Sequence, residues 1–464
     1  MDNTTICAIS TPPGQGGIAV IRISGENAFD ICDKIYISNR EGQTLVSQPP
    51  YTISFGKIVK ESRILDEVLV AVFHGPNSFT GENTVEISCH GSVYIQQEIL
   101  KLLLANGCRL AGPGEFTRRA FLNGKMDLSQ AEAVADLISS SSEASHKLAM
   151  NQMRGGFSEE LGKLRAQLLD FVSLIELELD FSEEDVEFAD RHKLNELAEN
   201  ITNVIKKLVQ SFSTGSVIKN GIPVAIVGET NAGKSTLLNR LLNEEKAIIS
   251  DTHGTTRDSI EDVININGIT FRLIDTAGIR ETEDEIENLG IERTYQKIDQ
   301  SAIVVWMIDS TQFCEKIDEV AEKIIPRIKG KQLIIIFNKI DKINPEEQHI
   351  LDEEFLPEVK ATRIYLSAKY KQNTEKLEEV LLQAANLPEL SENDVIVSNL
   401  RHYEALSHAL EAIERVNTGL QQQISGDFLS QDIRECMHYI GEITGQISND
   451  EILGNIFGKF CIGK

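Results

Sequence analysis

Residues 228–235 (GETNAGKS) have the spacing of a phosphate-binding loop, between an apolar run and a helical pattern. Glycines let backbone N–H groups curve around phosphate oxygens without Cβ clashes, and the start of the following helix adds positive partial charge. Lys234 can place its ammonium group against the outer phosphates, and the Ser235 hydroxyl can bind Mg²⁺. The segment therefore predicts a nucleoside triphosphate site.

Two downstream segments fit the Mg²⁺ and γ-phosphate side of such a site. In residues 275–278 (DTAG), Asp275 is placed to hold Mg²⁺ through water, and the Gly278 N–H can meet the γ-phosphate. Thr255 and Thr256 lie between this motif and the phosphate loop, where Thr256 can complete the Mg²⁺ shell. This order along the chain is typical of a nucleotide-dependent switch segment.

A third motif predicts which base is bound. In residues 338–341 (NKID), the Asp341 carboxylate can accept hydrogen bonds from the N1–H and 2-amino group of guanine, a donor pair that adenine lacks. The prediction of an NTPase thereby becomes the prediction of a GTPase. Further base-side contacts are expected from Asn338, Lys339, Ser367, Ala368 and Lys369.

One position departs from the small signalling GTPases, which have a water-orienting glutamine directly after the DTAG glycine. This sequence has Ile279 there, and an aliphatic side chain cannot polarise water. Either hydrolysis is very slow or the catalytic group lies elsewhere. Residues 281–287 (ETEDEIE) offer carboxylates, but the same run could equally be a solvated switch loop.

Composition and charge fit a protein outside the membrane. The chain has 464 residues, a net charge of −26 and 41% hydrophobic residues. No apolar run reaches membrane-spanning length, and the start MDNTTICAIS lacks a basic stretch followed by an apolar one, so we expect a cytoplasmic protein. Seven cysteines without a Cys-x-x-Cys pair argue against a disulfide framework.

The elements that must position these motifs change in kind along the chain. Residues 1–123 have mixed α and β character, whereas residues 124–216 and 385–464 show helical periodicity. Residues 217–384 alternate strands with helices, which implies a doubly wound, mostly parallel sheet. We therefore predict an N-terminal α+β domain, and a helical domain of two separated segments interrupted by an inserted α/β domain. The strands expected in the inserted domain are residues 223–227, 270–275, 302–308, 333–337 and 363–366.

Polar residues near the N-terminus and the last residues of the chain could bind a ligand. Residues 12–17 (PPGQGG) precede a strand carrying Arg22, and their glycines allow either close approach to a ligand or an ordinary tight turn. Glu86 alternates with apolar neighbours, which on spacing alone favours a solvent-facing strand position. Phe457 and Phe460 indicate that the C-terminal tail docks.

These motifs together resemble the MnmE (TrmE) family of tRNA-modification GTPases. The resemblance runs from end to end and is carried by TPPGQGGIAVIRISG, GPNSFTGE, GEFTRRAFLNGKMDLSQAEA, the GETNAGKS loop within a helical region, and the terminal CIGK. It implies an N-terminal domain similar to folate-dependent one-carbon enzymes and an inserted Ras-like GTPase domain.

The resemblance also implies cofactors and partners. The N-terminal domain of this family drives homodimerisation and binds 5-formyl- or methylene-tetrahydrofolate. The matching folate contacts are Arg22, Glu86, Lys125 and Lys464, with Cys461 nearby. The family works on tRNA in a heterotetramer with an FAD-dependent protein, MnmG. Together they install an aminomethyl or carboxymethylaminomethyl group on C5 of the wobble uridine.

The family's catalytic scheme replaces the missing glutamine. Its G domains dimerise across the nucleotides, with K⁺ where an arginine finger would otherwise neutralise charge on the β–γ bridge. The matching catalytic residues are Glu287, which orients water, and Lys234. The matching K⁺ ligands are Asn231, Ser250, Thr252 and Thr255, although Asn231 could equally be a polar filler of the loop. The predicted GTP contacts further include Ala232, Gly233, Thr236, Asp251, His253, Gly254, Thr276 and Ala277.

Two alternatives keep the GTPase domain but change its use. The first is a GTPase switch of the ribosome-assembly or iron-transport type, which would bind no folate. The second is an assembly scaffold in which GTP only tunes dimer affinity. Folate binding and tRNA modification separate these alternatives from the family's function.

Overall fold

The computed structural model describes residues 4–180, 191–229, 231–246, 262–274, 298–311, 321–322, 324–387, 394–447 and 450–463. The chain divides into two compact units. The first contains Met1–Ile138, Gln152–Asn203 and Ala405–Lys464, and the second contains Ser139–Asn151 and Val204–Glu404. In the described part of the chain, we find no helix with the length and apolar character needed to span a bilayer.

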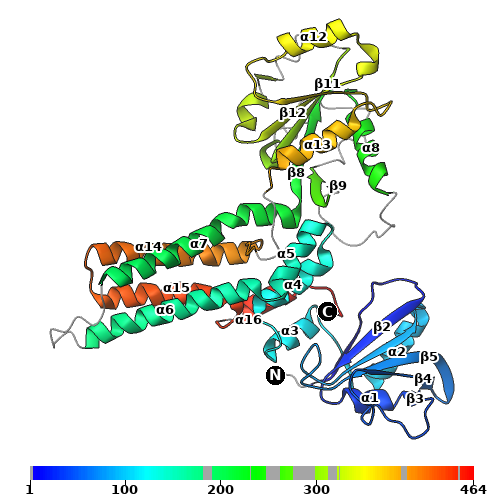
Figure 1. Cartoon of the computed structure of the whole chain (residues 1–464). Helices are drawn as coiled ribbons and strands as arrows, with labels where there is room; N and C mark the ends of the chain where they lie inside the picture. The colour runs from blue at the N-terminus through cyan, green and yellow to red at the C-terminus, as the bar shows by residue number, and fades with distance from the viewer. Residues whose placement is uncertain are drawn as a thin grey trace. The chain divides into compact units, whose positions relative to one another are not determined.

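A seven-stranded sheet forms the N-terminal part of the first unit, in the order β3-β4-β5-β6-β2-β1-β7 (Figure 1). Strands β1 and β7 pair in parallel, whereas the other neighbours pair antiparallel. The strands are β1 (Ile6–Ile9), β2 (Ile18–Ser24), β3 (Tyr36–Ser38), β4 (Thr52–Lys60), β5 (Arg63–Phe73), β6 (Thr84–His90) and β7 (Arg109–Leu110).

One face of this sheet is the core of the N-terminal part. Ala19, Ile21 and Ile23 of β2 are buried there together with residues of α1 (Ala28–Asp33) and α2 (Val93–Ala105). Because side chains alternate along a strand, the residues between them lie on the opposite face. That second face carries Arg22 and Glu86, next to the short helix α3 (Glu115–Leu122).

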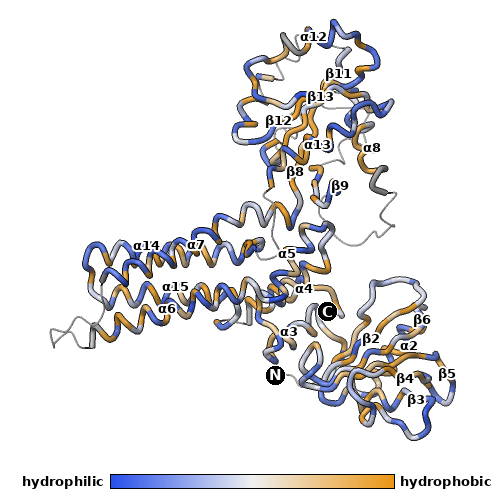
Figure 2. Tube along the Cα trace, viewed as in Figure 1, coloured by the Kyte–Doolittle hydropathy of each residue, from blue (hydrophilic) through white to orange (hydrophobic). Residues whose placement is uncertain are grey.

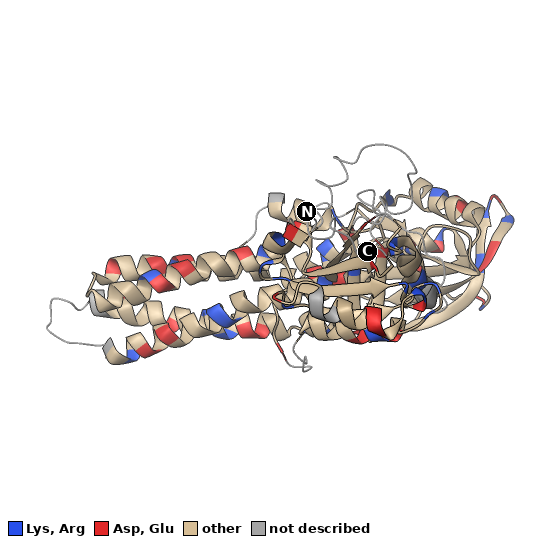
Figure 3. Ribbon diagram, turned by 90° about the horizontal axis from the view of Figure 1, so that it is seen from above, with Lys and Arg blue, Asp and Glu red and all other residues tan. Residues whose placement is uncertain are grey.

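The rest of the first unit is helical. Helix α15 packs along α6, and their facing positions are apolar and buried, including Leu164, Leu168 and Ile433. Acidic and basic residues alternate along these helices (Figure 3). Besides the helices that pack on the two sheets, the described residues form α4 (Leu128–Ser139), α5 (Glu143–Met153), α6 (Gly156–Asp180), α7 (Arg191–Asn220), α14 (Leu400–Gln421), α15 (Gly426–Thr444) and α16 (Asp450–Phe457). Of these, α5 lies mainly and α7 partly in the second unit.

The second unit contains a six-stranded sheet in the order β13-β12-β11-β8-β10-β9. Strands β9 and β10 pair antiparallel, and the other neighbours pair in parallel. The strands are β8 (Ile222–Gly228), β9 (Asp262–Ile266), β10 (Ile269–Leu273), β11 (Ile303–Asp309), β12 (Gln332–Asn338) and β13 (Thr362–Leu366). All five predicted strands of this sheet are present, and the sequence prediction lacked only β9, its antiparallel edge strand.

Helices cover this sheet on both faces, as a doubly wound sheet requires. One core joins the sheet to α8 (Lys234–Lys246) and α13 (Thr374–Ala385), and the other joins it to α12 (Pro345–Glu354) through Trp306, Phe337 and Phe355. Apolar residues are concentrated in β8, β11 and β12 (Figure 2). Two short 3₁₀ helices complete the unit, η2 (Ile325–Ile328) and η3 (Ile340–Lys342).

Candidate functional site

The phosphate loop joins β8 to α8 in a shape that requires glycine at two positions. Gly228 has φ +148°, and a Cβ there would lie 2.1 Å from the backbone oxygen of Met307. Gly233 has φ +100°, and its Cβ would lie 2.2 Å from Nδ2 of Asn338. Asn231 also has a positive φ, +67°. A tight loop at the N-terminus of a helix is suited to binding phosphate oxygens.

Lys234 is the first residue of α8, and its side chain folds back over the loop. Its Nζ donates hydrogen bonds to the backbone oxygens of Gly228 and Glu229, both at 2.6 Å. Ser235 and Thr236 follow in the first turn of α8. The ammonium group and the first hydroxyl of the helix are thus next to the loop that is expected to hold phosphates.

The side chain of Asn338 connects the phosphate loop to the loop at residues 367–369, which is expected to contact the base. Its side chain is buried, with Nδ2 donating to the backbone oxygen of Ala232 at 2.7 Å. Its Oδ1 accepts from the backbone N–H of Ala368 at 3.0 Å. Both ends of the amide are therefore used within the protein. Asn338 holds two loops together, a role that the sequence motif alone did not specify.

The residues expected to recognise the base meet at the same edge of the sheet. Ser367 donates a hydrogen bond from Oγ to Oδ1 of Asp341 at 2.6 Å, and Ser367 is fully buried while Asp341 is exposed. Lys369 lies beyond them, with Nζ 5.1 Å from the centroid of the Tyr370 ring. The bond from Ser367 restricts the orientation of an exposed carboxylate at this edge of the sheet.

Sequence reasoning missed Asp309, which ends β11 at this edge. Its carboxylate accepts from Nζ of Lys339 at 2.5 Å and from the hydroxyl of Thr311 at 2.7 Å. Burial raises the pKa of Asp309, but these hydrogen bonds outweigh burial and hold the pKa below its usual range. An aspartate directly after the apolar run 303–308 was the available signal. Asp309 fixes Lys339, which has φ +67°.

Several predicted nucleotide and cation contacts lie outside the described residues. They are Ser250, Asp251, Thr252, His253, Gly254, Thr255, Thr256, Asp275, Thr276, Ala277, Gly278 and Glu287. Lys464 of the predicted folate site is also outside them. Their roles stay predictions.

Arg22 and Glu86 form an ion pair on the second face of the first sheet. They are directly opposite each other on β2 and β6, and Nε of Arg22 donates to Oε1 of Glu86 at 2.8 Å. The Arg22 guanidinium also lies 5.6 Å from the Phe79 ring centroid and 5.7 Å from that of Phe116. Glu86 is only partly exposed, at 27% of its side chain, so it differs from the solvent-facing residue that spacing favoured.

Two further segments approach this part of the first unit. Nζ of Lys125 donates to the backbone oxygen of Pro76 at 3.0 Å, which connects Lys125 to the loop that carries Phe79. At the other end of the chain, Phe457 is buried against Leu128, as expected for a docked tail.

The tail continues along the turn at Pro113 and the segment that follows β1. Ile462 forms an antiparallel bridge with Pro113, and Ser10 Oγ donates to the backbone oxygen of Gly463 at 3.0 Å. Cys461 is an exposed free thiol. The other described cysteines are buried free thiols, namely Cys7, Cys32, Cys89, Cys108 and Cys436.

A doubly wound sheet, a phosphate loop and a guanine-type motif at the carboxyl ends of its parallel strands define a P-loop GTPase. Two family models match the chain. The model described as "MnmE helical domain" matches residues 128–461, and the model described as "GTP-binding protein TrmE N-terminus" matches residues 5–125. The chain therefore belongs to the MnmE family.

Full-length relatives agree with this assignment. The chain is 60% identical over 467 residues to the tRNA modification GTPase MnmE of Bacteroides thetaiotaomicron, covering 100% of both chains. It is 55% identical over 463 residues to the tRNA modification GTPase MnmE of Flavobacterium psychrophilum, covering 99% of both. Similarity at this level over the whole length includes the N-terminal, helical and GTPase parts together.

Proposed function

We propose that this protein uses GTP hydrolysis to modify the wobble uridine of certain tRNAs at C5, forming an aminomethyl or carboxymethylaminomethyl group. The carrying observation is that one edge of the second sheet brings together the phosphate loop, Asn338 and the Asp341–Ser367 pair. Membership of a family of tRNA modification GTPases supports the substrate class. An exposed carboxylate held by a serine hydroxyl fits the donor pair of guanine.

The residues of the phosphate loop fit a GTP·Mg²⁺ complex. The two glycines leave room where Cβ atoms would collide with the protein, and Lys234 can exchange its backbone partners for phosphate oxygens. Ser235 would hold Mg²⁺ together with Thr256, and Asp275 would do so through water. Bound Mg²⁺ neutralises charge on the β- and γ-phosphates.

The proposed catalytic group comes from the switch segments and from K⁺. Asn231 would bind K⁺ with Ser250, Thr252 and Thr255, and its positive φ of +67° gives it an unusual direction in the loop. A bound K⁺ supplies positive charge where GTPases otherwise use an arginine. Glu287 would orient the attacking water, which Ile279 cannot do.

The second face of the first sheet supports a folate site. Glu86 is an acceptor suited to the amino and ring N–H donors of a pterin, whereas Arg22, Lys125 and Lys464 are cations suited to the carboxylates of a folate. The aromatic rings of Phe79 and Phe116 next to Arg22 add apolar contact surface. Bound 5-formyl- or methylene-tetrahydrofolate would supply the one-carbon unit. Cys461 is proposed near this site without an assigned role.

The same face of the sheet supports a homodimer. Phe55 lies opposite Leu69, and their neighbours Ile53 and Ile37 point to the same face. These four apolar side chains are 46–67% exposed. Exposed apolar side chains gathered on one sheet face are typical of a protein contact, and a second copy of the chain is the proposed occupant.

The remaining proposals concern organisation and partners. We infer a heterotetramer with an FAD-dependent protein of the MnmG type, with tRNA as substrate, GDP as product and the cytoplasm as location. We also propose four segments: a folate-binding and dimerisation domain (1–123), helical segments (124–216 and 385–464) and a GTPase domain (217–384). The split helical domain is supported by the packing of α6 on α15, which are far apart in sequence.

Two measurements test the proposal in vitro. Calorimetry with 5-formyltetrahydrofolate should show binding, and Arg22→Met should weaken it; absence of heat at saturating ligand would favour a GTPase switch of the ribosome-assembly type. Hydrolysis should be fast in KCl and slow in NaCl, because Na⁺ is too small for the same oxygen cage. Equal rates in both salts would remove K⁺ from the mechanism.

A further inference from the structure

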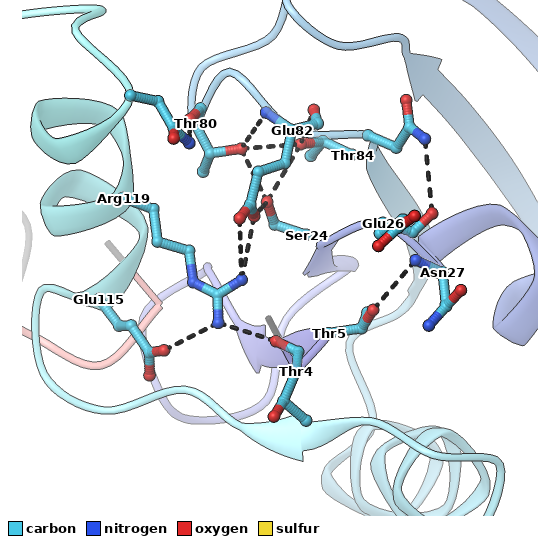
Figure 4. A network of polar contacts seen from close by, with 12 residues as sticks. Thr4, Thr5, Ser24, Glu26, Asn27, Thr80, Glu82, Thr84, Glu115 and Arg119 are labelled. Atoms are coloured by element: carbon cyan, nitrogen blue, oxygen red, sulfur yellow. Dashed lines mark hydrogen bonds and ion pairs between the residues drawn. The ribbon is translucent and has the colours of Figure 1, made fainter. Parts of the chain in front are cut away.

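Arg119 lies at the centre of a polar network in the first unit (Figure 4). Its side chain is only 9% exposed, and its Nη1 donates to both carboxylate oxygens of Glu82 at 3.1 and 3.0 Å. Its Nη2 donates to Oε1 of Glu115 at 3.1 Å and to the backbone oxygen of Thr4 at 2.8 Å. One guanidinium therefore joins α3 to two segments that are distant in sequence.

The Glu115 arm of this network leads to the C-terminal tail. Oε2 of Glu115 accepts from the backbone N–H of Gly112 at 2.8 Å, and Arg109 donates to both of its oxygens. This fixes the turn that Gly112 begins. Pro113 of this turn is bridged to Ile462, and the Gly114 N–H donates to the backbone oxygen of Cys461 at 3.4 Å.

Close packing at the turn shows how strictly its position is set. Gly114 has φ +60°, and a Cβ there would lie 2.9 Å from the backbone oxygen of Phe457 and 2.9 Å from Cβ of Phe460. The turn and the tail approach each other more closely than any larger residue would allow. The position of the turn therefore bears directly on the contacts of the tail.

The Glu82 arm leads to the loop that contacts Arg22. Oε2 of Glu82 accepts from the hydroxyl of Ser24 at 2.7 Å, which ties the end of the loop to β2. Thr80, two residues earlier, lies 2.7 Å from the same hydroxyl. Between Thr80 and Pro76 is Phe79, whose ring contacts the Arg22 guanidinium.

We propose that Arg119 is the positioning residue that docks the C-terminal tail on the turn before α3, the helix whose Phe116 ring lies against Arg22. It does so by holding the turn at Gly112 and the loop at Glu82 in one fixed arrangement. Its relevance to folate chemistry rests on the proposed function, whereas the docking itself does not. Without Arg119, Glu82 would lose this cation and Glu115 would keep only Arg109, so the connection between the loop and the turn would be broken.

The arrangement also explains why arginine is required. A guanidinium presents several N–H groups in a rigid plane, so it can bind two carboxylates and a carbonyl oxygen at once. A lysine carries the same charge but has no planar fork. Arg119→Lys should therefore restore only part of the docking, whereas a residue with a merely electrostatic role would be replaced fully.

Hydrogen–deuterium exchange of the full-length protein tests the proposal. In Arg119→Gln, peptides covering residues 112–116 and 456–463 should exchange about tenfold faster or more than in the wild type, since the bonds that join Glu115 to the Glu82 loop and to Thr4 are lost. The exchange rates of these peptides in Arg119→Lys should lie between those of the wild type and Arg119→Gln. If Arg119→Gln does not fold, Glu115→Gln, which keeps the side-chain shape, should show the same change at smaller size.

Glu98→Gln provides the matched control. Glu98 is similarly buried in the same sheet domain and pairs with Lys60 at 2.5 Å and Lys101 at 2.9 Å, away from the network. The Glu98→Gln substitution should leave hydrogen exchange unchanged in both peptides. Unchanged tail exchange in Arg119→Gln, or an equal increase in Glu98→Gln, would overturn the proposal. Calorimetry with 5-formyltetrahydrofolate on the same proteins reports separately on the proposed function.

Discussion

Asp341 is the residue that we propose determines the choice of nucleotide. One of its carboxylate oxygens accepts from Ser367 at 2.6 Å, yet the side chain as a whole is exposed at the edge of the sheet. The serine restricts the orientation of the carboxylate before any base arrives. Recognition of guanine then needs the negative charge and both oxygens.

Replacing Asp341 by Asn should therefore weaken GTP binding by roughly 10- to 100-fold, because hydrogen bonds to a charged group are lost. ATP binding should change little. Asp299→Asn, at an exposed aspartate paired with Arg327 in the same unit, is the control and should leave both affinities unchanged. Unaltered GTP affinity in Asp341→Asn would disprove the assignment of base recognition.

Glu115 gives a pH dependence with a definite sign. Burial raises its pKa, but hydrogen bonds from Arg109, the Gly112 N–H and Arg119 outweigh burial and lower the pKa below the ordinary value. A carboxylate with a lowered folded-state pKa stabilises the protein above its unfolded pKa of about 4.3. That stabilisation is lost as the pH falls through the folded-state value.

The free energy of unfolding of Glu115→Gln should therefore be lower than that of the wild type by roughly 1–3 kcal/mol at pH 7. The difference should shrink as the pH falls below about 4. Melting curves between pH 7 and pH 3 measure it. A gap that stays constant over this range would mean that the charge of Glu115 does not contribute.

The sequence predicted single motif residues, but it did not predict which side chains pair with one another in the fold. The motif residues Lys234, Asn338 and Asp341 were found because their spacing is local. The pairing of Arg22 with Glu86 was not derivable from spacing, because it depends on strand pairing across 64 residues. Asp309 was missed for a similar reason, since its partner Lys339 comes from the neighbouring strand's end.

Among the elements, the strand–loop–helix unit around Gly228 depends most on backbone shape. Gly228→Ala would combine a positive φ with a Cβ 2.1 Å from a backbone oxygen that cannot move aside. We expect a loss of roughly 3 kcal/mol or more in unfolding free energy and a loss of GTP binding. Chemical denaturation and nucleotide titration measure the two effects.

The control variant Gly330→Ala separates the cost of a positive φ from the cost of a steric clash of the added Cβ. Gly330 has φ +84° in the same unit, but nothing lies within 4 Å of an added Cβ. Its substitution should cost only about 1 kcal/mol and leave GTP binding intact. Equal effects of the two substitutions would show that the contact with Met307 is unimportant.

The helices and strands that the sequence predicted are those with a clear apolar periodicity and sufficient length. Strands β8, β11 and β12 are buried apolar runs, and β10 and β13 alternate apolar with polar residues, so all five were recognisable. Strand β9 was missed although Asn267 and Gly268, both with positive φ, form the turn of a hairpin with β10. In the first sheet, β7 has only two residues and was too short to produce a pattern.

At the scale of the whole molecule, the split helical domain was predictable because helical periodicity stops and resumes around the α/β segment. The particular pairing of α6 with α15 was not, since its ion pair between Glu176 and Arg434 joins residues 258 positions apart. The homodimer was predicted only from the resemblance to the family, not from the sequence pattern itself. The exposed apolar residues of β4 and β5 are where we propose that two copies of the chain meet.

Phe55→Glu should therefore convert a homodimer into a monomer, because it places a charge within the apolar face formed with Leu69. Sedimentation analysis measures the mass. Ile350→Glu, at a 48% exposed residue of α12, is the control and should not change the oligomeric state. A dimer that survives Phe55→Glu would place the interface elsewhere.

The measurement that tests the central claim most directly is nucleoside analysis of tRNA from a strain lacking this protein. Restoring the wild-type chain should bring back the C5-modified wobble uridine, whereas Lys234→Ala, produced at the same level, should not. If the wild type fails to restore the nucleoside, or if Lys234→Ala restores it fully, then GTP-dependent tRNA modification is not what this protein does.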